Sequence, residues 1–174
     1  YYTLHLNAAL DVSTISPLDR GLSIQRTYYD AACDPESDDC QPIDTIAAGQ
    51  QVRVVLDITV PNNLSYAIVE DPLPAGAEAI DPNLATSQSG QGPTITDQQY
   101  AYGYWGYWFF NRIEFRDEKV VFHAGFLPAG SYQYSYTLQT NIPGSYQVRP
   151  AFGYQEFFPE VNGRSDGFEF EITK

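Results

Sequence analysis

The stretch Val52–Val60, VRVVLDITV, decides the fold class of this chain of 174 residues. Apolar side chains occupy every second position, and the positions between them are mostly polar. The apolar face consists of Val52, Val54, Leu56, Ile58 and Val60, and the opposite face of Arg53, Val55, Asp57 and Thr59. Because successive side chains of a β-strand point to opposite faces, this period of two predicts a strand with one buried face.

The same alternation recurs on both sides of this strand, and helical periodicity is nearly absent. Residues that share one face are Tyr2, Leu4, Leu6 and Ala8; Leu22, Ile24, Arg26 and Tyr28; Tyr132, Tyr134, Tyr136 and Leu138; and Phe168, Phe170 and Ile172. Ser65–Asp71 is expected as a return strand, and Ile113–Arg116 and Lys119–Ala124 as a hairpin. Pro- and Gly-bearing turns separate these segments, for example at Pro72–Gly76 and Leu127–Gly130.

Repeated strands with one apolar face indicate antiparallel sheets that share a core. We therefore expect an all-β fold, an immunoglobulin-like antiparallel β-sandwich, with a closed barrel as the alternative. The length favours a single domain over residues 1–174, with a long surface insertion at about 82–107. The chain lacks methionine, even at position 1, so we expect a domain cut from a longer protein. An N-terminus trimmed after secretion is the alternative.

The net charge of −13 excludes whole classes of partner. A negative field of this size repels phosphate backbones, so we expect no nucleic-acid binding. No window approaches about 20 consecutive apolar residues, so we expect no membrane insertion by this domain.

Cys33 and Cys40 enclose six residues, and a disulfide is the favoured interpretation because tetrahedral zinc needs four ligands. A disulfide implies an oxidising, extracytoplasmic compartment. The enclosed carboxylates of Asp34, Glu36, Asp38 and Asp39 are a candidate calcium site. Their spacing matches no EF-hand, however, and a solvated acidic loop is the simpler interpretation. We expect no cofactor.

Nothing in the sequence demands catalysis. The only histidines, His5 and His123, lie far apart, and no G-x-S-x-G nucleophile elbow is present. Gly163–Gly167, GRSDG, is better explained by turn chemistry than by a nucleophile motif.

The segment Tyr100–Phe110, YAYGYWGYWFF, contains eight aromatic residues. Tyrosine and tryptophan suit surfaces that are exposed at one time and covered at another. The segment is interpreted as a sugar-stacking platform, a contact face toward a neighbouring domain, or partly as sandwich core.

Several blocks, in this order, cover nearly the whole chain and resemble the C-terminal macroglobulin-like domain of bacterial alpha-2-macroglobulins. They are Arg20–Tyr29, RGLSIQRTYY; Val69–Gly76, VEDPLPAG; Glu114–Val120, EFRDEKV; Leu127–Gly130, LPAG, with the strand Tyr132–Tyr136; and Phe157–Ser165, FFPEVNGRS. The resemblance implies a macroglobulin-type β-sandwich, the last module of a large extracytoplasmic protease inhibitor. Full-length members trap proteases, and an internal Cys-x-Glu-Gln thioester in a separate domain couples to the attacker.

This chain contains no Cys-x-Glu-Gln, so it cannot form the covalent bond itself. The resemblance implies a non-catalytic domain that packs against the thioester domain, shields the bond and couples conformational change. Its partners would be that domain, the neighbouring macroglobulin domains and, through the full-length protein, target proteases. The contact candidates are Tyr154, Gln155, Glu156, Phe157 and Phe158, with Tyr107 and Trp108 added. The alternatives are burial of Phe157 and Phe158 in the sandwich and, for function, a carbohydrate-binding or adhesion module using residues 100–110.

Overall fold

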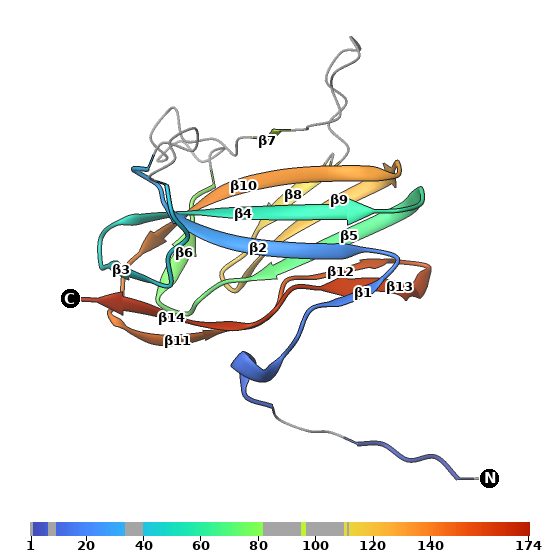
Figure 1. Ribbon diagram of the computed structural model, residues 1–174, viewed down its shortest axis with the longest axis horizontal. Coiled ribbons are helices and arrows are strands. Elements are labelled where there is room, and N and C mark those ends of the chain that lie inside the picture. Colours follow the sequence, from blue (N-terminus) through green and yellow to red (C-terminus); the bar gives the residue numbers. More distant parts are fainter. Residues whose placement is uncertain (1, 7–9, 34–39, 82–94, 97–109, 111) are drawn as a thin grey trace.

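A computed structural model describes residues 2–6, 10–33, 40–81, 95–96, 110 and 112–174. These residues form an all-β sandwich of antiparallel sheets, as the alternation predicts (Figure 1). The one helical segment in the described part is a single 3-10 turn, η1 (Val12–Thr14). Among these residues no helix has the length and apolarity needed to cross a bilayer.

The strands form three sheets. The six-stranded sheet has the order β1 (Leu18–Arg20), β13 (Phe158–Arg164), β12 (Phe152–Gln155), β5 (Leu64–Pro72), β9 (Lys119–Leu127) and β8 (Arg112–Phe115). The five-stranded sheet has the order β2 (Ser23–Asp30), β4 (Gln51–Val60), β10 (Gly130–Thr140) and β6 (Ala77–Ala79), and β7 (Ile95–Thr96) also pairs with β10. The three-stranded sheet has the order β11 (Gly144–Val148), β14 (Phe168–Thr173) and β3 (Thr45–Ala47), and β3 runs parallel to β14.

β4 is the centre of the five-stranded sheet, because β2 pairs along one side of it and β10 along the other (Figure 1). The predicted apolar face of β4, from Val52 to Val60, is at most 1% exposed. The predicted face of β10, from Tyr132 to Leu138, is at most 2% exposed. The alternation in these strands therefore predicts both the element and its buried side.

One core connects the three sheets. β5 and β9 of the six-stranded sheet contribute Val69 and Phe122, and β14 of the three-stranded sheet contributes Phe170. The Phe110 ring packs edge-on against those of Phe122 and Tyr134, with centroids 6.0 and 4.7 Å away. The expected hairpin across Asp117-Glu118 is confirmed as β8 and β9. Ser65–Asp71 is confirmed as a strand, β5, but it pairs with β9 and β12 of the six-stranded sheet and does not return beside β4.

A buried ion pair crosses this core. Arg26 of β2 lies on the predicted face with apolar neighbours, and its Nη1 donates to Asp71 Oδ1 of β5 at 2.5 Å. Both side chains are fully buried. The Tyr136 hydroxyl of β10 donates to Asp71 Oδ2 at 2.7 Å, and the Arg26 guanidinium lies 5.1 Å from the Phe168 ring centre. The pair thus joins all three sheets.

The expected first strand is wrong for this domain. Tyr2, Leu4 and Leu6 lie in a segment without regular structure, and their side chains are exposed; Ala8 lies outside the described residues. An alternating pattern forms a strand only when a partner supplies the other half of the hydrogen bonds, and no described strand pairs with this segment. Most of the expected insertion at 82–107 also lies outside the described residues, except β7, which pairs with Gln133 and Tyr134.

Candidate interdomain surface

The contact candidates lie in the hairpin between β12 and β13. Tyr154 and Gln155 end β12, and Glu156, Phe157 and Phe158 form the segment that we call the hairpin tip. Phe157 is 65% and Phe158 54% exposed, so the alternative that buries both rings in the sandwich is wrong. Large apolar side chains held in water this way are typical of surfaces that another molecule covers.

An irregularity in β13 shapes the hairpin. The pairing shifts from Tyr154 with Asn162 to Gln155 with Phe158, so β13 has extra residues between these two pairs. Pro159, one of them, has no N–H to give to the ladder. Asn162 Nδ2 instead donates to the carbonyl oxygens of Pro159 and Glu160, at 2.8 and 3.2 Å. The Asn162 side chain therefore holds the bulge, and the bulge fixes the direction of the hairpin tip.

Tyr66 of β5 extends the apolar surface of the hairpin tip. Its ring meets the Phe157 ring edge-on at 5.2 Å between centroids, and its carbonyl oxygen accepts from the Glu156 N–H at 3.0 Å. Tyr66 has φ = 55°, a left-handed conformation that costs a non-glycine residue about 1–3 kcal/mol. Its ring is more than half exposed. The exposed rings of Tyr66 in β5 and Phe157 in the turn between β12 and β13 thus form one contiguous patch.

An open hollow of about 290 Å³ lies beside this patch. Its lining residues are Tyr66, Ala67, Ile68, Arg112, His123, Ala124, Gly125 and Glu156. The hollow therefore combines an aromatic ring and small apolar groups with charged side chains from β8 and the hairpin tip.

Ion pairs cover the sheet next to the hollow. The Glu114 carboxylate lies 2.7 Å from Arg112, 2.5 Å from Arg116 and 3.3 Å from Nε2 of His123. The hydrogen bond from Arg116 is the largest cause that lowers the pKa of Glu114 below its usual value. Lys119 pairs with Glu70 at 3.1 Å. Burial raises the pKa of Tyr154, and the carboxylates of Glu70 and Glu156 add to that shift. These ion pairs, most of whose side chains are partly buried, give the surface a polar border on the side of β8 and β9.

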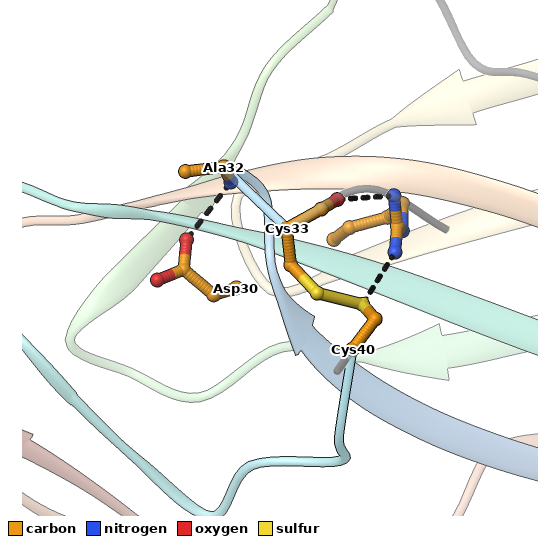
Figure 2. The surroundings of a disulfide bond; sticks show 5 residues. Asp30, Ala32, Cys33 and Cys40 are labelled. Atoms are coloured by element: carbon orange, nitrogen blue, oxygen red, sulfur yellow. Dashed lines mark hydrogen bonds between the residues drawn. A yellow bond between two sulfur atoms is a disulfide. The ribbon is translucent and has the colours of Figure 1, made fainter. Parts of the chain in front are cut away.

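The structure contains the expected disulfide between Cys33 and Cys40, with Cα atoms 5.5 Å apart (Figure 2). Asp30 Oδ1 accepts from the Ala32 N–H at 2.9 Å, which tightens the turn after β2. Arg53 of β4 donates to Cys33 O at 3.3 Å and to Cys40 Sγ at 3.4 Å. The two cysteines are thereby tied to the central strand.

The calcium candidates Asp34, Glu36, Asp38 and Asp39 lie outside the described residues. In the described part of the chain no three His, Cys, Asp or Glu side chains are grouped so as to hold a metal ion.

Tyr107 and Trp108, like most of the aromatic segment 100–110, also lie outside the described residues. The described member, Phe110, is buried in the core, so its ring is not part of any sugar-stacking surface. The burial of Phe110 supports core packing for this ring. The roles of the other aromatic residues in the segment stay predictions.

Ser165 of the GRSDG segment has a structural role. It is fully buried, its Oγ accepts from the Ala151 N–H at 3.0 Å, and it donates to the Asp166 carbonyl at 2.8 Å. The hydroxyl is therefore engaged by backbone on both sides, as expected for turn chemistry.

Sequence reasoning missed Tyr66 and the charged residues of the hollow. Tyr66 belongs to the predicted strand Ser65–Asp71, and nothing local marks its ring as exposed. Its contact with Phe157 joins residues 91 positions apart, which the chain brings together only through the pairing of β5 with β12.

The comparisons with known proteins agree with this architecture. The family model of the bacterial alpha-2-macroglobulin MG10 domain matches residues 21–160. An alpha-2-macroglobulin homolog from Nostoc sp. is 29% identical over 125 residues, which is 72% of this chain and 6% of that protein. The chain therefore spans a small fraction of the length of this curated relative.

Two solved structures share the fold. Salmonella alpha-2-macroglobulin reacted with methylamine matches with a TM-score of 0.68 and 22% identity, over 93% of this chain and 10% of that chain. Native Escherichia coli alpha-2-macroglobulin from domain MG7 to the C-terminus matches with a TM-score of 0.67 and 20% identity, over 93% of this chain and 25% of that chain. Because the family model covers most of the sequence, the chain belongs to the bacterial alpha-2-macroglobulin MG10 domain family.

Proposed function

We propose that this domain is a non-catalytic packing module of a protease-trapping alpha-2-macroglobulin, and that its hairpin tip contacts the thioester domain. The observation that carries the proposal is the contact between the exposed rings of Tyr66 and Phe157, with the exposed ring of Phe158 next to Phe157 in the sequence. Isolated exposed apolar residues are common, but contiguous ones that a polar border surrounds indicate an interface.

The physical role of such a contact is to exclude water. A thioester hydrolyses when water reaches it, and a rigid apolar lid lowers the local concentration of water. The hairpin tip suits this role because two sets of hydrogen bonds hold it in place. One comes from the Asn162 side chain, and the other runs from the Glu156 N–H to the Tyr66 carbonyl oxygen. Loss of the contact on proteolysis would couple rearrangement of the parent chain to exposure of the bond.

The partners would be the thioester domain and neighbouring macroglobulin domains of the same chain, with target proteases bound through the full-length protein. The disulfide between Cys33 and Cys40 supports an extracytoplasmic location, because such bonds persist in oxidising compartments.

The test replaces Phe157 and Phe158 by alanine in a full-length parent chain that carries Cys-x-Glu-Gln, and measures the rate of methylamine incorporation. We expect the rate to rise several-fold, because water and amines reach the bond more freely. The folded domain should be nearly unaffected, since both side chains are exposed and surface substitutions usually change stability by less than about 0.5 kcal/mol.

The matched control is Ile142→Ala in the turn between β10 and β11. Ile142 is 59% exposed. The turn between β10 and β11 lies at the opposite end of the sandwich from the turn between β12 and β13 (Figure 1). The rate of methylamine incorporation in the Ile142→Ala variant should equal that of the wild type. Equal methylamine rates in the wild type, the double variant and the control would remove the hairpin tip from the role.

A further inference from the structure

The most exposed large apolar side chains of the described residues precede the sandwich. Tyr2 is 96%, Leu4 84% and Leu6 85% exposed, more than either ring of the hairpin tip. They alternate with Thr3 and His5, so an extended chain places the three apolar groups on one face. The alternation is typical of a strand in a sheet, but the side chains of this segment are exposed and no described strand pairs with it.

Within the described residues the segment pairs with no strand of the sandwich. The core is closed without it, since the inner faces of β2, β4 and β10 are already buried. In Figure 1 the N-terminal segment runs away from the sheets.

The chain is anchored to the sandwich a few residues further on, from Asp11. Asp11 caps η1 by accepting from the Ser13 N–H at 3.0 Å, and Val12 is buried. Val12 fits tightly against Gly167, where an added Cβ would lie 2.4 Å from Val12 Cγ2. The Gly167 N–H also donates to the Ile15 carbonyl at 3.4 Å. Packed residues therefore hold the chain from Asp11 to Ile15 against the sandwich.

We infer that Tyr2–Leu6 is a strand donated to the open sheet edge of another module of the same long chain. This rests on the proposed function only in taking the domain as one module among several. Relatives and solved structures of the family are many times longer than the region they share with this chain, so other modules lie within reach. Addition of a strand would bury one apolar face and satisfy the backbone on one side.

Other occupants fit less well. A lipid surface takes apolar side chains but offers no partners for the backbone N–H and C=O groups of an extended segment. A second copy of this chain would bring together two charges of −13, which repel. Residues 2–10 contain no Asp, Glu, Lys or Arg, so the segment is suited to a neutral, hydrogen-bonding edge.

The experiment is hydrogen exchange with mass spectrometry on the full-length parent protein, read on the peptide that contains Tyr2–Leu6. We expect its amides to exchange at least ten-fold more slowly than an unstructured peptide of the same sequence. The variant Leu4→Asp, on the apolar face, should abolish the protection, whereas Thr3→Asp, on the other face, should retain most of it. Exchange in β4 serves as the control that the sandwich remains folded.

Two results would overturn the inference. One is a wild-type segment that exchanges at the unstructured rate, and the other is protection that disappears on dilution, which would assign the partner edge to a second copy. Neither result bears on the hairpin tip, whose test is methylamine reactivity, so the two proposals fail separately.

Discussion

At the scale of single residues, Arg26 is buried as the alternation predicts, but the residues that make its burial possible are distant in the sequence. The alternation of β2 places Arg26 among Leu22, Ile24 and Tyr28, and the structure buries it there. A buried guanidinium is tolerated because Asp71 supplies the opposite charge and Tyr136 completes the hydrogen bonding of the carboxylate. Burial, followed by the nearby Asp71 carboxylate, in turn raises the pKa of Tyr136 well above its usual value.

The variant Asp71→Ala should therefore be strongly destabilising. It leaves the Arg26 charge buried without its partner, and breaking a buried pair in this way costs about 3–5 kcal/mol. Urea unfolding of the wild type and the variant measures the difference in the free energy of unfolding.

The matched control removes both charges, as Arg26→Met with Asp71→Leu. Apolar replacement of both partners is often neutral, so we expect the double variant to be much closer to the wild type than the single one. A loss below about 1 kcal/mol for Asp71→Ala would contradict the assigned role of the pair.

At the scale of elements, the sequence predicts strands well where apolar residues on the buried face of a strand alternate with polar residues on its other face. β4 and β10 satisfy this, and their faces are confirmed. It fails at Tyr2–Leu6, because alternation does not reveal whether a partner strand is present. It also does not show the bulge in β13, which depends on Asn162 bonding back to Pro159.

Close packing between β13 and the start of β2 gives a test at this scale. An added Cβ at Gly163 would lie 1.7 Å from the Leu22 carbonyl oxygen, which is backbone and cannot rotate away. Gly163→Ala should therefore destabilise the sandwich by about 1–3 kcal/mol or more, as overpacking does. Thermal or urea unfolding measures the change.

Gly125 of β9 is the matched control, since an added Cβ there meets nothing within 4 Å. Gly125→Ala should change stability by less than about 0.5 kcal/mol. Equal stability of the two variants would mean that β13 does not pack on Leu22 as described.

At the scale of the whole molecule, the fold class, its antiparallel sandwich and the family are predicted from the sequence and confirmed. The sequence points to only part of the candidate surface. The segment Tyr154–Phe158 is marked by its resemblance to the family, but the participation of Tyr66 requires β5 to pair with β12. Arg112 and His123 join the hollow only because β8 and β9 continue the same sheet. Local alternation therefore predicts the sheets, whereas the composition of the candidate surface depends on which distant strands pair.

The most direct test of the central claim is hydroxyl-radical footprinting of the native full-length protein, with oxidation read at single residues. In the sandwich alone Phe157 and Ile142 are similarly exposed, at 65% and 59%. If the hairpin tip is an interdomain contact, Phe157 and Phe158 should be oxidised several-fold more slowly than Ile142, after correction for intrinsic reactivity. Equal corrected rates at all three residues would show the tip open to water in the native protein and would contradict the account.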